Sequence, residues 1–239
     1  MNIKEQKTKE QKQEGVKKAK QLLKLYPYFS KNRFADFITG DETWVHYFEP
    51  KRKSANRVWA TKHARRPVKA KRSITLKKVL YCICFTNNVP EIQIPVPKGK
   101  SVTSKVYKNV VLKKLQKYLY KRRPKHGLKY VSLLHNNASS HKAQIVIDFL
   151  KQQNVRVLPH PAYSPDLAPC DYFLFPRLKS ILAGKRYASR KAFGSAVCHC
   201  LRERVSEIYC LICYKNLLKT QLCKLYGYTE SVNMGIGPS

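Results

Sequence analysis

The stretch Tyr130-Val131-Ser132-Leu133-Leu134-His135-Asn136-Asn137 is a short apolar run that ends abruptly in polar residues. An apolar run without alternation is typical of a strand that is buried on both faces, as in the middle of a sheet. The sequence then predicts a helix to about Gln153, with Ser139 or Ser140 as its N-cap. The stretch therefore predicts a central strand whose carboxyl end carries polar side chains.

The elements on either side of this strand predict the fold class. Alternating, β-branched and aromatic residues indicate strands, and apolar residues at helical spacing indicate a helix. Before the central strand, the sequence predicts strands at Phe37–Phe48, Arg57–Ala60, Lys78–Phe85 and Glu91–Val96, followed by a helix at Ser104–Tyr120. After it, the sequence predicts a strand at Val155–Leu158, a turn-rich loop at Pro159–Pro169 and a helix beginning near Asp171. This order predicts an α/β protein, with a mixed sheet flanked by helices.

The charge of the chain points to a polyanionic partner. The 239 residues carry a formal net charge of +34, while 43% hydrophobic residues exclude a wholly disordered basic tail. Between Pro50 and Ile147 there are 25 Lys and Arg residues and a single acid, Glu91. Nucleic acid is the first partner to expect and an anionic membrane surface the second.

Neither a transmembrane run nor a signal peptide is recognisable, so we expect the chain in a reducing compartment, the cytosol or nucleus. Its eight Cys residues are then not expected to form disulfides. The late pairs Cys198/Cys200 and Cys210/Cys213 allow a zinc site. Because the second pair lies in an apolar run, we favour buried thiols.

Three polar residues interrupt or follow apolar elements: Asp41 in the first strand, Asn136 after the central strand and Asp171 at the start of a helix. Strand ends in an α/β sheet converge on one edge. Oxygen ligands gathered there would suit Mg²⁺, and a pair of such ions supports phosphodiester chemistry. Equally, Asp41 could form a local salt bridge and Asp171 could be an N-cap.

A second basic group follows the predicted helix that ends near Tyr120. Lys121, Arg122 and Arg123, next to Tyr118 and Tyr120, could clamp and stack a nucleic acid. A solvated helix end explains the same residues as well.

Three stretches resemble one known family: Thr39-Gly40-Asp41-Glu42-Thr43-Trp44, Leu133-Leu134-His135-Asn136-Asn137-Ala138 and Tyr163-Ser164-Pro165-Asp166-Leu167-Ala168-Pro169-Cys170-Asp171-Tyr172-Phe173-Leu174-Phe175. They are similar to the catalytic domain of mariner-type (Tc1/mariner) DNA transposases. The family's last two aspartates are separated by 34 residues, and 34 residues lie between Asn136 and Asp171.

The resemblance implies an RNase H-like domain at residues 22–197. Composition predicts a basic polar arm at 1–21, either a solvated helix or a disordered segment, and a helical extension at 198–239. It implies that Asp41, Asn136 and Asp171 bind two Mg²⁺ or Mn²⁺ ions. In the family these acids catalyse hydrolysis at transposon ends and attack of the free 3′-OH on target DNA. The activity implied is thus that of a metal-dependent DNA transposase or endonuclease in the nucleus, with no small-molecule cofactor.

The resemblance also implies a DNA interface. The basic segment Pro50–Lys62, which includes Lys51, Arg52 and Lys53, matches a family loop that contacts DNA and the partner subunit. We therefore expect these three residues to bind DNA and the chain to form a homodimer.

Two departures from the family pattern modify this expectation. The family motif reads His-Asp-Asn, whereas this chain reads His135-Asn136-Asn137, so one anionic ligand is replaced by a neutral amide. Because stabilisation of developing charge is often the largest catalytic contribution, we expect strand cleavage to be strongly reduced or absent. Residues 1–20 cannot hold the family's paired helix-turn-helix modules, so we expect DNA contact without sequence preference. The alternative is a non-catalytic nucleic-acid-binding or structural protein.

Overall fold

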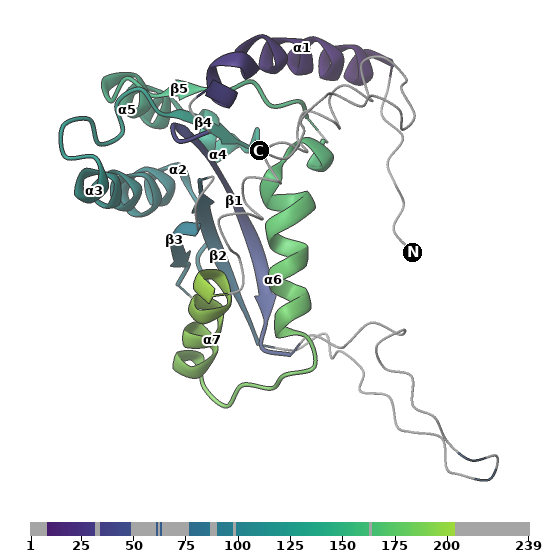
Figure 1. Cartoon of the computed structure of the whole chain (residues 1–239). Helices are drawn as coiled ribbons and strands as arrows, with labels where there is room; N and C mark the ends of the chain where they lie inside the picture. The colour runs from purple at the N-terminus through teal and green to yellow at the C-terminus, as the bar shows by residue number, and fades with distance from the viewer. Residues whose placement is uncertain are drawn as a thin grey trace.

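A five-stranded mixed sheet forms the centre of the computed structural model, which describes residues 9–31, 34–48, 61, 63, 77–86, 90–97, 99–162 and 164–203. The strand order is β3-β2-β1-β4-β5 (Figure 1). Neighbouring strands are antiparallel from β3 to β1 and parallel from β1 to β5. The strands are β1 (Phe37–His46), β2 (Lys78–Phe85), β3 (Pro90–Pro95), β4 (Ser132–His135) and β5 (Arg156–Val157).

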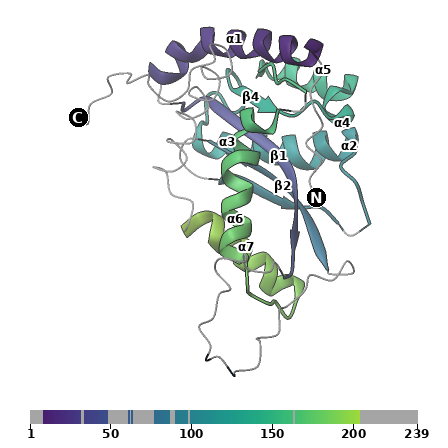
Figure 2. The ribbon, with the colours of Figure 1, turned by 90° about the vertical axis from the view of Figure 1, so that its right-hand side faces the viewer.

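Helices cover both faces of this sheet (Figures 1 and 2). One apolar cluster joins the sheet to α1 (Lys9–Lys31), the π-helical η4 (Cys170–Leu174), α6 (Phe175–Leu182) and α7 (Arg190–Glu203). A second cluster, on the opposite face, joins it to η2 (Tyr107–Leu112), α3 (Lys113–Arg122) and α5 (Gln144–Gln152). The short elements α2 (Ser104–Val106), α4 (Ser139–Lys142) and the 3₁₀ turn η3 (Pro165–Leu167) complete the described fold.

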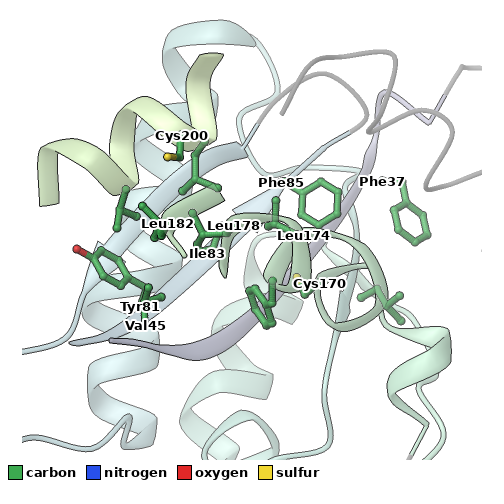
Figure 3. Close-up of a cluster of buried hydrophobic side chains, with 14 of the residues drawn as sticks. Phe37, Val45, Tyr81, Ile83, Phe85, Cys170, Leu174, Leu178, Leu182 and Cys200 are labelled. Atoms are coloured by element: carbon green, nitrogen blue, oxygen red, sulfur yellow. The ribbon is translucent and has the colours of Figure 1, made fainter. Parts of the chain in front are cut away.

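The alternation of side chains along each strand decides which residues meet which helices. In β2, Tyr81 and Ile83 pack toward α6 and α7, whereas Cys82 and Cys84 pack toward η2. Figure 3 shows the first of these clusters, in which Leu174, Leu178 and Leu182 lie against the β2 side chains. The same alternation places Asp41 of β1 and the residue after β4, Asn136, on the α6 face of the sheet.

The predicted fold class is confirmed, and so is the order of the described elements. The strand predicted at Lys78–Phe85 has those bounds in the structure. Ser139 or Ser140, predicted as the N-cap of the helix after β4, was wrong: Ala138 caps α4, with no side-chain hydrogen bond. An extended residue, Ala143, divides α4 from α5. The strand predicted at Arg57–Ala60 lies outside the described residues.

Two helices cross the domain boundaries that the sequence predicts. Helix α1 continues through residues 21 and 22, with Ala19 and Leu22 both buried. Helix α7 continues through residues 197 and 198, and its Cys200 and Leu201 belong to the core. None of the helices in the described ranges combines the length and apolar composition needed to cross a bilayer.

Candidate metal and nucleic-acid site

Asp41 lies in the middle of β1, on the face covered by η4 and α6. Parallel pairing aligns Gly40 with His135, so Asp41 is level with Asn136, the residue that follows β4. The Asp41 Oδ1 atom accepts a hydrogen bond from its neighbour, the backbone N–H of Glu42, at 2.8 Å. The strand register thus brings the first two predicted site residues together across adjacent strands.

Asn136 is bonded directly to Asp41. Its Nδ2 donates to Asp41 Oδ1 at 2.7 Å, and its own Oδ1 accepts from the backbone N–H of Ala138 at 3.0 Å. The second bond closes an Asx turn, which explains why the chain leaves β4 at this residue. The amide therefore presents its N–H groups, not its oxygen, to the Asp41 carboxylate.

Asp171 reaches the same place from η4. Residues Pro165–Leu167 form the 3₁₀ turn η3, and the backbone N–H of Asp171 then donates to Ala168 O at 2.9 Å, which starts the helix. The preceding residue, Cys170, is fully buried, with its Sγ 3.9 Å from Thr39 Oγ1 of β1. This contact joins η4 to β1, and Asp171 is close enough to Asp41 for its charge to act on that carboxyl.

Both carboxyl groups have raised pKa values. Burial raises the pKa of Asp41 to about 7, and the negative charge of Asp171 adds to the rise. Burial also raises the pKa of Asp171, although Lys179 of α6 partly opposes this effect. Paired carboxyls with raised pKa values are a common mark of a functional site.

The donor set fits a hard divalent cation in part. The oxygens of Asp41 and Asp171 are ligands that Mg²⁺ and Mn²⁺ prefer, and a cation there would relieve the repulsion between them. The third position is different, because the Asn136 oxygen is held by Ala138 N and faces the turn. Over the described part of the chain, no group of three or more His, Cys, Asp or Glu residues could hold a metal ion.

Sequence reasoning missed a buried polar network behind these residues, on the η2 face. His141 Nε2 lies 3.2 Å from Glu42 Oε1, and His141 Nδ1 lies 3.3 Å from the backbone oxygen of Asn136. His135 Nδ1 lies 3.0 Å from the hydroxyl of Tyr107. The signal was Glu42 itself, since a carboxylate on a covered strand face requires a partner. The network braces the turn that holds Asn136.

The described basic residues that were predicted to bind DNA, Lys121, Arg122 and Arg123, are not part of this acidic cluster. Lys121 and Arg122 are exposed at the end of α3. Arg123 pairs with Asp36, the residue before β1, at 3.0 Å. Five residues of strand place Asp36 roughly 16 Å from Asp41. Lys51, Arg52 and Lys53 lie outside the described residues.

No model of a protein family matches the chain. Individual relatives do: it is 33% identical over 167 residues to the Mariner Mos1 transposase of Drosophila mauritiana, a match that covers 69% of this chain and 47% of the relative. It is 31% identical over 183 residues to the human histone-lysine N-methyltransferase SETMAR, covering 72% of this chain and 25% of that protein. The chain thus spans about half of the first relative and a quarter of the second.

Solved structures agree with these matches. The catalytic domain of Mos1 superposes with a TM-score of 0.73 at 25% identity, covering 94% of this chain and 98% of that domain. The Mos1 paired-end complex with the left transposon end gives a TM-score of 0.82 at 26% identity, covering 95% of this chain and 65% of that one. The sheet order and flanking helices are therefore those of an RNase H-like fold, and the chain is homologous to the catalytic domain of mariner transposases.

Proposed function

We propose that the chain is a transposase-derived DNA-binding domain of the cut-and-paste type, whose strand-cleavage chemistry is impaired by Asn136. The observation that carries this proposal is the 2.7 Å hydrogen bond from Asn136 Nδ2 to Asp41 Oδ1, inside a fold that matches the Mos1 catalytic domain. Related Mos1 structures include a paired-end complex with a transposon end and a strand transfer complex. DNA is accordingly the partner that we propose for this chain.

Asp41 and Asp171 are the residues that would hold a divalent ion, with Asn136 at the third position. Mos1 structures have been solved with Mn and with Mg, which supports these metals here. When bound between two carboxylates, such ions activate an attacking oxygen and stabilise the leaving oxygen of a phosphodiester. The neutral amide of Asn136 supplies less negative charge than a carboxylate, so the site binds the metal more weakly.

The residues of this chain have separate roles in the proposal. The Asn136 N–H holds Asp41 Oδ1 in the absence of metal, and the His141–Glu42 pair holds the backbone of Asn136. For Asn136 to donate its oxygen to a cation, the amide must rotate and release both Asp41 and Ala138 N. This rotation opposes metal binding, in addition to the missing charge.

The net charge of +34 supports contact with the DNA backbone. Such contact releases counterions, so affinity falls steeply with salt and does not depend on sequence. We propose that Lys51, Arg52 and Lys53 belong to this interface, together with Lys121 and Arg122. DNA as the substrate also implies that the protein acts in the nucleus, and the paired-end assembly of Mos1 supports a homodimer.

A second candidate function is non-catalytic DNA binding. The Asn136 side chain favours this candidate, because both ends of its amide are already hydrogen-bonded, to Asp41 and to the backbone N–H of Ala138, without a metal ion. The two candidates share the DNA partner and differ in whether the acidic site binds a divalent ion.

Two measurements on the purified chain test the proposal. Fluorescence anisotropy with labelled duplexes of unrelated sequence should give equal affinities that fall linearly with the logarithm of salt concentration. Calorimetric titration with Mn²⁺ should show binding that Asp171→Ala weakens by about ten-fold or more.

Asp148→Ala is the matched control, since this carboxylate is exposed on α5 and bonds only locally to Gln144 in the contacts seen. It should leave Mn²⁺ binding unchanged. Failure to bind duplex DNA would contradict the proposal as a whole. Equal Mn²⁺ affinity of the two variants would favour the non-catalytic alternative.

A further inference from the structure

A cavity of ≈ 550 Å³ opens at the carboxyl ends of β4 and β5, between α1 and α5. These elements lie together at one end of the sheet (Figure 1). His135 and Asn136 form part of its wall, so the cavity adjoins the acidic site without containing Asp41 or Asp171. Its size lies within the usual range for small-molecule and cofactor sites, and its position at parallel strand ends is typical of such sites.

One wall of the cavity is apolar. It is formed by side chains of α5 and of the strand and loop that follow, among them Leu150, Val157 and Leu158. Leu150 and Leu158 are buried, whereas Val157 leaves 47% of its surface exposed although it lies in a strand. An exposed β-branched residue on a cavity wall offers a surface against which a flat ring can pack.

The charged side chains that line the cavity are lysines. Lys18, Lys142 and Lys151 come from three different helices, and among the described residues neither Asp nor Glu is part of the lining. Lys18 is the best fixed of the three, because its Nζ donates to His160 O at 3.3 Å and pairs with Glu14 at 3.2 Å. Lys142 and Lys151 are exposed beside the opening. The positive charges of Lys142 and Lys151 favour an anionic ligand.

The inner end of the cavity is polar. His135 is buried there, and its Nδ1 lies 3.0 Å from the hydroxyl of Tyr107. Asn137 is held in place by its Nδ2, which donates to His160 O at 2.6 Å. Ring nitrogens and amides are groups that hydrogen-bond the edge of a nucleobase.

We propose that this cavity is a nucleoside-phosphate site, in which Lys142 and Lys151 meet the phosphate and the base packs against Val157. A nucleotide offers a matching group to each part of the cavity: a phosphate to the lysines, a ring face to the apolar wall and a ring edge to the polar end. A purely apolar ligand would leave the lysines unused, and inorganic phosphate would leave the apolar wall exposed.

Two sources supply this chemistry: a free nucleotide, or an unpaired nucleotide at the end of a DNA strand. The second source rests on the proposed function, because it requires DNA to lie at the adjoining acidic site. The first does not, so the two can be distinguished by experiment.

The test is a titration of the full chain with deoxyadenosine monophosphate and with deoxyadenosine, followed by NMR. We expect saturable one-to-one binding of the monophosphate and at least about ten-fold weaker binding of the nucleoside. Lys151→Glu should weaken monophosphate binding by about ten-fold or more. Val157→Trp should abolish it by filling the cavity from an exposed position, and unfolding curves show whether this variant keeps its fold.

Lys129→Glu is the matched control: this lysine is exposed in the turn before β4 and does not line the cavity. The proposal is overturned if the monophosphate does not saturate by about 10 mM. It is also overturned if Lys129→Glu weakens binding as much as Lys151→Glu does, or if folded Val157→Trp binds like the unmodified chain.

Labelled DNA then separates the sources. If the site takes a strand end, Val157→Trp weakens binding of a duplex with a 5′-phosphorylated single-stranded overhang and leaves a blunt duplex unaffected. If only free nucleotides bind, both duplexes are unaffected while monophosphate binding is lost. Monophosphate binding with no duplex binding at all would refute the proposed function and leave the nucleoside-phosphate site standing.

Discussion

Replacing Asp41 with Asn should stabilise the folded chain at neutral pH. Asp41 Oδ1 accepts two hydrogen bonds, from Asn136 Nδ2 at 2.7 Å and from Glu42 N at 2.8 Å. An Asn side chain keeps an oxygen at that position and so keeps both bonds. What the substitution removes is a negative charge that is largely buried and faces the carboxylate of Asp171.

The size of the effect follows from the pKa of Asp41, which rises from 3.8 to about 7 in the folded protein. Each unit is worth about 1.4 kcal/mol, so ionised Asp41 costs the fold about 4 kcal/mol at neutral pH, as an upper bound. The sign follows from proton binding. The folded state holds this proton more tightly, so its stabilising contribution is complete below about pH 4 and is lost as pH rises to about 7.

The assay is urea unfolding of the unmodified chain and of Asp41→Asn, with chelator present, from about pH 4 to about pH 8. We expect the two free energies of unfolding to agree at the acidic end and to differ by about 2–4 kcal/mol at the basic end, in favour of Asp41→Asn. Mn²⁺ should reduce this difference in the free energy of unfolding, because an ion that binds the unmodified chain through Asp41 stabilises it and not Asp41→Asn. Asp148→Asn, an exposed change on α5, should shift neither end.

Equal stability of the two chains at about pH 8 would refute the reasoning, because it would mean that ionised Asp41 carries no cost in the folded state. A less stable Asp41→Asn would refute it more strongly, since it would show that the carboxylate is stabilising there. Either result would also remove the main electrostatic reason for expecting a cation between Asp41 and Asp171.

Three further substitutions test the packing around the site, each by urea unfolding. Gly40→Ala should cost about 1–3 kcal/mol, because a Cβ there would lie 2.8 Å from Cys84 Sγ, and adding Cys84→Ala should recover part of the loss. Tyr107→Phe should cost about 1–2 kcal/mol, since it leaves buried His135 Nδ1 without its 3.0 Å partner; an unchanged stability would mean that this bond contributes nothing. Phe193→Ala should cost about 3–5 kcal/mol, as this ring is fully buried on α7; a loss below about 1 kcal/mol would show that α7 is not part of the core.

The fold could be predicted from the sequence where the hydrophobic pattern was unambiguous. The continuous apolar run of β4 and the well-bounded run of β2 indicated buried strands, and helical spacing indicated the segment that became α2, η2 and α3. The break at Ala143 could not be predicted, because neither Gly nor Pro marks it. The predicted Ser cap failed because the chain already turns at Asn136, whose Oδ1 accepts from the backbone N–H of Ala138.

The site could be predicted as a set of residues but not as a network. The strand-end rule and the family resemblance both pointed to Asp41, Asn136 and Asp171, and the structure places them together. Their roles in metal binding and catalysis stay predictions. Sequence spacing could not show that Asn136 donates a hydrogen bond to Asp41, because that bond depends on the register of β1 and β4. It also could not show that His141 contacts Glu42. It also gave no indication that Arg123 pairs with Asp36.

The measurement that tests the central claim most directly is nicking of supercoiled plasmid DNA with Mn²⁺. The unmodified chain is run beside Asn136→Asp and Asp171→Ala. If Asn136 replaces a carboxylate that the chemistry needs, the unmodified chain nicks no faster than Asp171→Ala, and Asn136→Asp nicks faster than both. Brisk nicking by the unmodified chain, abolished by Asp171→Ala and not improved by Asn136→Asp, would contradict the claim that Asn136 impairs this site.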